Sequence, residues 1–349
     1  MRAVTAYAPA SMGNLSVGFD LLGAALAPVN DARPFGDLVT VALLAEGCEV
    51  GDSGIVLTCS GRYAEFLPTE GNIVERCAEV FIERHVPDFL QRHHGLALHL
   101  QKNLPIGSGL GSSASSVVAA LAALNRFFGE PLDPEALLLL TGELEGAISG
   151  SIHYDNVAPS LLGGMQLMQA DRALTLPQFE NWYWLVAYPG ITLSTAKMRA
   201  LLPAQYDRAT TIEFGQNLAG FIAASYRGDE DSALALLKDV LAEPHRAAHI
   251  PGFVAAKAQL SELGFEAVGI SGSGPTLFAV CRDGALAEQG AQYLQQHYLT
   301  NEFGMVRVCR IAADGVSYSE PQSLQSQSNP LQSDQAEPAQ SQEQQDAIN

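Results

Sequence analysis

Residues 105–113 of the chain read PIGSGLGSS, and the runs on either side of this segment set the expected architecture. A β-like apolar run precedes the segment, and a long Ala- and Leu-rich run with helical character follows it. Glycines permit positive φ angles and close approach to a ligand, and the N–H groups of such a loop and of the next helical turn form a concave set of donors. The segment is therefore predicted to bind phosphate; the alternative is a flexible loop that only caps the helix.

Two common phosphate-binding motifs do not fit this segment. A Walker A loop needs Gly-Lys-Ser/Thr, and residues 105–113 contain no lysine. The dinucleotide motif G-x-G-x-x-G would need glycine where the chain has Ser112. A second glycine-rich segment, GISGSGPT at 269–276, lies between two β-like runs. It reads as a hairpin turn that could support the first loop.

On both sides of the loop, predicted strands and helices follow one another without the strict β-α alternation of a doubly wound sheet. Alternating or β-rich runs predict strands at residues 38–44, 55–60, 96–100, 182–188 and 305–311, and a hairpin over 267–281. Helical spacing is expected at residues 72–84, 113–128, 135–148, 214–226, 232–241 and 253–263. The helix from 135 follows Asp133-Pro134, an N-cap with proline at the first helical position.

The length and composition indicate two folded domains and a tail. The chain has 349 residues, of which 47% are hydrophobic, which is too long for one ordinary core. The composition changes near residue 318, and from residue 319 the chain is rich in Gln, Ser and Pro without any Lys, Arg or aromatic residue. Such a segment cannot bury enough apolar surface to offset the entropy of ordering, so a disordered tail is expected. A partner-binding peptide is the alternative.

Charge and cysteine content exclude several classes of protein. The formal net charge of −19 repels phosphate backbones, so no nucleic-acid partner is expected. Five cysteines without a C-x-x-C pair disfavour a disulfide framework or a zinc ribbon and fit a reducing compartment. The N-terminus lacks the apolar region of a signal peptide, and the most apolar helical stretch, 117–124, is far shorter than the roughly 20 residues that span a bilayer. A soluble cytoplasmic protein without a membrane partner is expected.

Some polar residues stand outside solvated charge runs. Asn14 and Asp20 lie among glycines and apolar residues, where each could be a site residue or a turn-forming side chain. Glu143 and Glu145 are two positions apart on an expected helix, so they face different sides and cannot both serve one site.

Three further polar features lie in the second half of the chain. His153-Tyr154-Asp155-Asn156 forms a rare run of four hydrogen-bonding side chains after small residues. Arg199 and Arg246 stand in apolar or Pro-containing surroundings. Each arginine alone is a weak candidate, although arginine is the best side chain for a bidentate grip on a carboxylate.

Taken together, these segments resemble the kinase superfamily named for galactokinase, homoserine kinase, mevalonate kinase and phosphomevalonate kinase, the GHMP kinases. The family's three motifs correspond to the segment from Ala8 to Ser11 onward, to 105–115 and to 269–276, in that order. The resemblance covers about residues 1–317. Within the superfamily the chain looks like the homoserine kinases, on Asn14-x5-Asp20 and on the segments 149–164, 188–203 and 243–253.

The resemblance implies an α+β fold of two domains. Residues 1–160 would form a nucleotide-binding domain like domain 2 of ribosomal protein S5, and 161–317 a ferredoxin-like C-terminal domain, followed by the tail at 318–349. ATP would lie between the two domains. Members of the family usually form homodimers, which the residues of this chain do not themselves predict.

The implied activity is ATP-dependent phosphorylation of the side-chain hydroxyl of L-homoserine to O-phospho-L-homoserine, a step of threonine biosynthesis. Glu145 would hold Mg²⁺ together with a serine of the 112–113 pair, Ser113 being preferred. Asn156 would lie beside the reacting hydroxyl, and Asn72 near the adenine. The ATP phosphates would contact Pro105, Ile106, Gly107, Ser108, Gly109, Leu110, Gly111, Ser112 and Ser113. The homoserine pocket would be lined by Asn14, Asp20, His153, Arg199 and Arg246.

One departure from the wider superfamily bears on mechanism. Mevalonate kinases resemble this chain but carry a lysine in the first motif and a catalytic aspartate later. Here the first motif reads PASMG at 9–13, and the later position corresponds to Asn156, which cannot act as a base near neutral pH. Direct in-line transfer without a dedicated protein base is therefore expected. A superfamily kinase for another small alcohol and a non-catalytic nucleotide- or amino-acid-binding regulator are the two alternatives.

Overall fold

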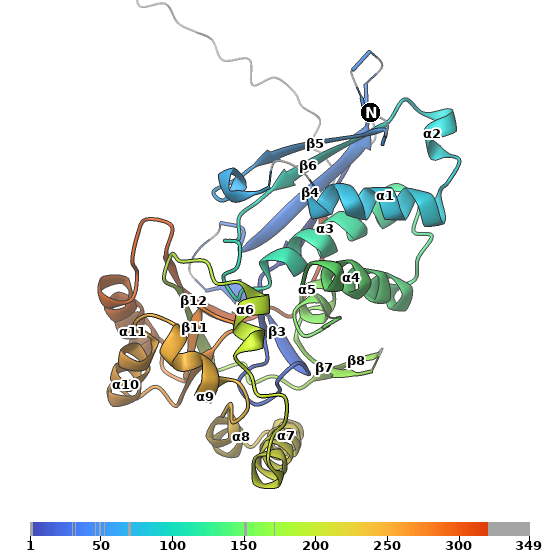
Figure 1. Cartoon of the computed structure of the whole chain (residues 1–349). Helices are drawn as coiled ribbons and strands as arrows, with labels where there is room; N and C mark the ends of the chain where they lie inside the picture. Colours follow the sequence, from blue (N-terminus) through green and yellow to red (C-terminus); the bar gives the residue numbers. More distant parts are fainter. Residues whose placement is uncertain are drawn as a thin grey trace, which may run out of the picture.

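The computed structural model describes residues 3–319, apart from residues 30, 32, 46, 49, 52, 69, 70, 150, 151 and 171. Helices and strands are mixed throughout the chain, and the α+β class is confirmed. The strands form two sheets, each with its own set of covering helices (Figure 1). Within the described residues, the helices are all too short or too polar to cross a membrane.

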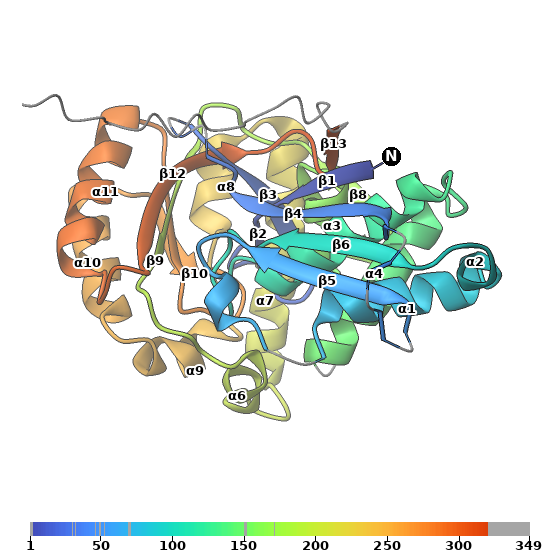
Figure 2. The same ribbon diagram turned by 90° about the horizontal axis from the view of Figure 1, so that it is seen from above.

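The first sheet has the strand order β13-β1-β4-β6-β5 and is antiparallel except for the parallel pair β5 and β6. Its helices lie on one face, as the view from above shows (Figure 2). The strands are β1 (Ala3–Pro9), β4 (Gly36–Leu43), β5 (Ile55–Ser60), β6 (Leu96–Gln101) and β13 (Ser317–Ser319). The helices of this half of the molecule are α1 (Ile73–His85), α2 (Phe89–Arg92), α3 (Ser112–Phe127), α4 (Pro134–Ser149) and α5 (Val157–Leu162).

Helix α3 is the central element of this half, and the glycine-rich loop leads directly into it. It packs on β1 and β4 and is flanked by α1 and α4. Its run of alanines keeps the helix surface narrow, so that almost every residue from Ala114 to Leu124 is buried. Because the helix is held on all sides, its first turn and the loop before it have a fixed position.

The second sheet is covered on both faces. Its path is β10-β11-β9-β12-β3-β7-β8, and β2 pairs with β3 at the side. In β9, Trp184 and Val186 belong to one core cluster, with residues of α7 and α8, whereas Leu185 and Ala187 belong to another, with residues of α10 and α11. This period of two places successive side chains on opposite faces, each against its own helical layer.

The second sheet and its helices take up most of the rest of the chain. The strands of the second sheet are β2 (Ser11–Gly13), β3 (Leu22–Pro28), β7 (Met165–Gln169), β8 (Arg172–Leu176), β9 (Tyr183–Tyr188), β10 (Ala267–Ile270), β11 (Leu277–Cys281) and β12 (Met305–Ile311). Its helices are α6 (Thr195–Ala200), α7 (Arg208–Arg227), α8 (Glu230–Leu236), α9 (Glu243–Arg246), α10 (Phe253–Leu263) and α11 (Gly284–His297). Short 3₁₀ turns lie at Ala64–Phe66 and Ala247–His249.

Most expected elements are present, and the differences have local causes. Helix α7 begins six residues before the expected position 214, because the Asp207 side chain accepts a hydrogen bond from the Thr210 N–H and caps the helix there. Helix α8 ends at Leu236 rather than 241, because Asp239 binds the N–H groups of 241–243 and turns the chain. Strands β1 and β3 were not expected, since their alanines give a weak β signal. Helix α11 was not expected either, although its alanines and glutamines favour a helix.

The two sheets exchange segments across the expected domain boundary at 160/161. Strand β3, from the N-terminal part of the chain, pairs with β12 and β7 in the second sheet. Strand β13, from the C-terminal end, pairs with β1 in the first sheet. The expected tail therefore begins two residues too early, since Tyr318 and Ser319 belong to β13. Residues 320–349 lie outside the described residues, and the domain division itself stays a prediction.

Candidate active site

A cavity of about 480 Å³ lies where the glycine-rich loop meets residues of both sheets. All but two of the residues predicted for the site line this cavity. The exceptions are Pro105 and Leu110, which are buried, and the Leu110 side chain is part of the apolar core beneath the second sheet. The lining residues from the predictions are Asn14, Asp20, Asn72, Ile106, Gly107, Ser108, Gly109, Gly111, Ser112, Ser113, Glu145, His153, Asn156, Arg199 and Arg246.

The backbone of the loop is turned so that its carbonyl groups bind neighbouring protein segments. The carbonyl of Gly107 accepts the Leu193 N–H at 3.1 Å, and that of Ser108 accepts the Thr276 N–H at 3.0 Å. The carbonyl of Leu110 accepts the Ser11 N–H at 3.2 Å. Carbonyl oxygens held in this way do not repel an anion in the cavity, which favours phosphate binding by the loop's N–H groups.

Two glycines of the loop are required by close approach as well as by backbone conformation. Gly109 has φ 83°, and a Cβ there would lie 2.3 Å from the carbonyl oxygen of Ser271. Gly111 has φ 61° and is the N-cap of α3, where it provides no side-chain acceptor. The first-turn N–H groups of α3 therefore receive no cap bond from Gly111, which leaves them suited to an anion.

The second glycine-rich segment supports the first, as one reading of the sequence had it. β10 and β11 pair as an antiparallel hairpin, and residues 271–276 connect them. The Ser271 hydroxyl donates to the Gly109 carbonyl at 2.6 Å, and the Thr276 N–H donates to the Ser108 carbonyl. The carbonyl of Gly272 accepts from the side chains of Asn14 and Arg246, so this segment joins the loop to the charged part of the cavity.

Asn72 caps a helix, a role that was not predicted from the sequence. It is the N-cap of α1, and its side-chain oxygen accepts the Val74 N–H at 3.0 Å. The residue is 5% exposed and lines the cavity. The amide nitrogen of Asn72 could donate to adenine without disturbing this cap, because the cap uses only the side-chain oxygen.

Glu143 and Glu145 face different sides of α4, as predicted. Glu143 forms a bidentate surface pair with Arg84, at 2.8 and 2.7 Å. Glu145 accepts the Ser113 hydroxyl at 3.0 Å and lines the cavity. Among the described residues, no three His, Cys, Asp or Glu side chains are placed so that they could hold a metal ion by themselves. One carboxylate and one hydroxyl fit Mg²⁺, which favours oxygen ligands and completes its shell with phosphate and water.

A cluster of charged side chains lies on the other part of the lining. Arg199 makes a bidentate pair with Asp20, with N–O distances of 2.9 and 2.8 Å, and His153 Nδ1 lies 3.6 Å from the same carboxylate. Asp20 raises the pKa of Arg199, while burial lowers the pKa of His153. Asp20 and Arg199 were both predicted for the homoserine pocket, and in this structure they pair with each other.

Arg246 is more deeply buried than Arg199. It is 2% exposed, and its guanidinium donates to the carbonyl of Met198 through Nε and to that of Gly272 through Nη1. Both arginines lie against the ring of Phe19, with guanidinium carbons 5.5 and 5.6 Å from its centroid. Burial lowers the pKa of Arg246, and arginine stays charged in proteins even so.

Asn14 and Asp20 combine the two roles that the sequence left open. Both have positive φ, 71° and 59°, so both belong to a tight turn. The Asn14 side chain accepts the Asp20 N–H at 2.8 Å and donates to the Gly272 carbonyl at 3.0 Å. The Asn14 side chain therefore holds the backbone at Asp20, and the Asp20 carboxylate lines the cavity.

Asn156 lies where the loop and the charged cluster meet. The Ser11 hydroxyl donates to its side-chain oxygen at 3.0 Å. A Cβ on Gly111 would lie 3.0 Å from that oxygen, which shows how closely the end of the loop approaches Asn156. Asn156 thus lines the cavity beside the end of the loop.

Asp155 lines the cavity but was not among the predicted site residues, although it lies in the polar run 153–156. The side chain lines the cavity and is 5% exposed. Burial first, and then the negative charges of Asp20 and Glu145, raise its pKa to about 7. The run of four polar residues at 153–156 was the only sequence signal for Asp155, and it does not indicate that this side chain is buried. The cavity also includes residues 192–196 and Ser273, which lie in the family-like segments 188–203 and 269–276 but were not selected as site residues.

Comparisons with known proteins agree with this geometry. Residues 72–164 match the family model of the GHMP kinase N-terminal domain, and residues 221–299 match that of the GHMP kinase C-terminal domain. The chain is also similar to the crystal structure of homoserine kinase from Cytophaga hutchinsonii, with 29% sequence identity and a TM-score of 0.78 over 91% of this chain and 98% of that one.

More distant structures share the fold alone. A putative homoserine kinase from Listeria monocytogenes is 21% identical, with a TM-score of 0.64 over 90% of this chain and 99% of that one. Mevalonate kinase from methicillin-resistant Staphylococcus aureus is 16% identical, with a TM-score of 0.59 over 88% and 99%. Because both family domains match in order and contribute residues to one cavity, this chain belongs to the GHMP kinases, a family that transfers phosphate to small molecules.

Proposed function

We propose that this kinase phosphorylates the side-chain hydroxyl of L-homoserine with ATP, giving O-phospho-L-homoserine for threonine biosynthesis in the cytoplasm. The observation that carries the proposal is the charged cluster in the cavity: a carboxylate, Asp20, and two arginines, Arg199 and Arg246, close to the glycine-rich loop. An amino acid presents an ammonium and a carboxylate, which such a cluster can pair. The similarity to a homoserine kinase at 29% identity supports the same substrate.

The division of labour follows from the geometry of the lining. Asp20 and Asn14 would accept from the substrate ammonium, and the two arginines would receive its carboxylate. Asp20 retains acceptor capacity, since a carboxylate has about four lone-pair sites. In this structure Asp20 and Arg199 neutralise each other. The ammonium and carboxylate of homoserine would replace part of this pairing, and both protein partners would already be in position.

Phosphate binding would fall to the loop N–H groups and the first turn of α3. Glu145 and Ser113 would hold Mg²⁺, which would supply positive charge to neutralise the transferred group. Asn156 lies between the two parts of the lining, so it would orient the attacking hydroxyl by hydrogen bonding. Positioning and charge neutralisation are the main requirements of phosphoryl transfer.

Transfer without a dedicated protein base remains part of the proposal. A loose transition state loses the hydroxyl proton late, so alignment outweighs proton removal. Asp155 is the residue that most challenges this view, because it is a carboxyl in the same lining with a pKa of about 7. A group with that pKa is ionised often enough at neutral pH to accept a proton.

An ADP-release assay over a panel of amino alcohols, mevalonate and galactose tests the substrate. L-Homoserine should be turned over far better than either non-zwitterionic alcohol, since a substrate lacking an ammonium or a carboxylate leaves buried partners unsatisfied. Equal turnover of mevalonate would refute the assignment in favour of another small-alcohol kinase. Nucleotide binding without ADP release from any alcohol would indicate a regulator instead.

A further inference from the structure

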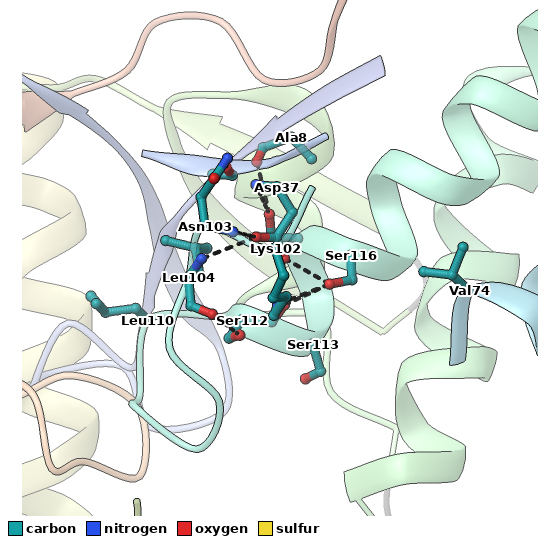
Figure 3. A network of polar contacts seen from close by, with 12 residues as sticks. Ala8, Asp37, Val74, Lys102, Asn103, Leu104, Leu110, Ser112, Ser113 and Ser116 are labelled. Carbon is teal, nitrogen blue, oxygen red and sulfur yellow. Dashed lines mark hydrogen bonds and ion pairs between the residues drawn. The ribbon is translucent and has the colours of Figure 1, made fainter. Parts of the chain in front are cut away.

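A buried ion pair lies beneath the glycine-rich loop, outside the roles assigned so far. Lys102 follows β6 and is 2% exposed, and Asp37 in β4 is fully buried. Figure 3 shows the two side chains in contact at the base of the loop, with the first turn of α3 beside them. Lys102 also borders the cavity, so the pair lies directly behind the predicted phosphate site.

The hydrogen bonds of the pair hold both ends of the loop. One oxygen of Asp37 accepts the N–H groups of Asn103 and Leu104, at 2.9 and 3.1 Å, where the chain enters the loop. The Lys102 ammonium donates to the Ser112 carbonyl at 2.8 Å, where the chain leaves the loop and α3 begins. The Ser112 hydroxyl closes the same gap by donating to the Leu104 carbonyl at 3.2 Å.

All hydrogen-bonding groups of the pair are used. The ammonium has three acceptors, namely Asp37 Oδ2, the Ser112 carbonyl and Ser116 Oγ. Ser116 in turn donates to Asp37 Oδ2 at 2.7 Å, so this hydroxyl connects the two charges. A neutral amine would supply one proton fewer, and this acceptor set therefore fits the charged form of Lys102.

Stability alone does not explain a charged pair at this position. Burial lowers the pKa of Lys102, which shows that the surroundings oppose its charge. Apolar residues of similar volume are often as stable as a buried ion pair, whereas removing one partner is strongly destabilising. A cation is also unfavourable at a helix N-terminus, where the dipole is already positive. What the pair supplies instead is a set of directional bonds to the two ends of one loop.

We propose that Lys102 and Asp37 are positioning residues for the nucleotide, and that they hold the ends of the 105–111 loop so that its N–H groups stay arranged for the ATP phosphates. The proposal rests on the proposed function only in taking ATP as the ligand of this loop. Without the pair, the loop would have to be ordered by the nucleotide itself, which weakens binding. The charged cluster does not take part in this network and should bind homoserine as before.

The test is the affinity of each variant for a non-hydrolysable ATP analogue with Mg²⁺, measured by calorimetry, beside KM for ATP and for homoserine. Lys102→Met removes the ammonium, Lys102→Met/Asp37→Asn removes both charges, and Ser116→Ala removes only the hydroxyl between them. Lys257→Met is the matched control, because it breaks a lysine–carboxylate pair with Glu243 away from the loop. Thermal melting identifies which variants are folded.

We expect the analogue to bind Lys102→Met and the double variant roughly tenfold or more weakly. Ser116→Ala should lose affinity to a smaller degree, and KM for homoserine should change by less than about twofold in all of them. Lys257→Met should bind the analogue as the wild type does. Ser116→Ala keeps the test decisive if both lysine variants unfold, because it leaves the two charges in place.

Unchanged affinity for the analogue in the folded variants overturns the proposal, even if their melting temperatures fall, since the pair would then serve stability alone. Equal losses for the analogue and for homoserine also overturn it, because a general distortion would not separate the two ligands. Wild-type protein that binds no analogue would refute the proposed function instead, and wild type that binds the analogue but turns over no homoserine would leave the positioning role supported.

Discussion

The loop side and the charged side of the cavity recognise their ligands with different parts of the polypeptide. On the loop side, the carbonyls of residues 107–110 are bonded to neighbouring segments, so the backbone N–H groups are the groups suited to phosphate. On the charged side, Asp20, Arg199 and Arg246 present ionised side chains. Backbone donors can serve any nucleoside triphosphate, whereas charged side chains at fixed positions select one substrate shape. We therefore expect the loop side to bind phosphate whatever the acceptor alcohol, and the few charged side chains to decide the choice of substrate.

The largest effect is expected on the charged side. Arg199→Ala and Arg246→Ala should each raise KM for homoserine strongly, because truncating one partner of a desolvated charge pair costs roughly 2–5 kcal/mol. KM for ATP should change little, since the loop side does not use these side chains. Steady-state kinetics with each substrate varied in turn measures both constants.

Arg84→Ala provides the control for the arginine variants. Arg84 forms a bidentate pair with Glu143 of the same geometry as the Arg199–Asp20 pair, but on the surface. An exposed pair contributes about 0–1 kcal/mol, so both KM values should stay at the wild-type level. Normal homoserine binding by calorimetry in both Arg199→Ala and Arg246→Ala would place the substrate carboxylate elsewhere.

The loop side should respond differently, through turnover more than through homoserine binding. Glu145→Gln should melt near the wild-type temperature and lose roughly 100-fold or more in kcat, because it weakens the proposed Mg²⁺ ligand. Glu143→Gln, two residues away on the opposite side of α4, should keep its activity. The reverse pattern in these two variants would assign the metal to the other glutamate.

A smaller loss is expected at Asn156, where the two sides meet. Asn156→Ala should lower kcat roughly 10- to 100-fold and leave a measurable remnant, because Asn156 aligns the hydroxyl and removes no proton. The kcat profile at saturating substrates should lack a limb between about pH 4 and 7 from a catalytic carboxyl or imidazole.

Asp155 and His153 are the two groups that could contradict this mechanism. A basic limb in kcat that disappears in Asp155→Asn, together with nearly all turnover, would identify Asp155 as the base. The same result in His153→Gln would identify His153. Retention of substantial turnover in both variants supports transfer by alignment.

The last expected effect is on stability rather than on activity, and it follows from burial on the charged side. The pKa of Asp155 is raised to about 7, so the folded protein binds this proton more tightly than the unfolded chain does. The stabilisation is therefore fully present below the unfolded pKa, near 4, and is lost as the pH rises through about 7. Asp155→Asn should gain relative to wild type between pH 5 and 8, by roughly 2–3 kcal/mol at most.

Thermal melting of the ligand-free protein at pH 5 and pH 8 measures this difference, which should amount to a few degrees in Tm. The neighbouring charges of Asp20, Glu145 and Arg199 are kept in both proteins, so they are common to the comparison. A gain of the variant that is the same at both pH values would show that Asp155 is not buried with a raised pKa.

The sequence was informative wherever a feature is local. The glycine-rich loop, the helix after it, the supporting hairpin and the opposite orientation of Glu143 and Glu145 could all be predicted, because each depends on residues within a few positions of one another. Resemblance to the family added the scattered polar residues. Of the seventeen predicted site residues, loop residues included, fifteen line one cavity. Strands β1 and β3 escaped prediction because alanine and glycine give little β signal, and their place is fixed by pairing with distant strands.

Other properties depend on contacts that only folding creates. Asp20 and Arg199 are 179 residues apart in the chain, and Lys102 and Asp37 are 65 apart, so no local pattern predicts either pair. The raised pKa of Asp155 likewise arises from burial beside Asp20 and Glu145. Glycine loops carry their conformation in their own backbone preferences, but the charge state and partner of a buried side chain are set by desolvation and by whatever the fold brings within a few ångströms.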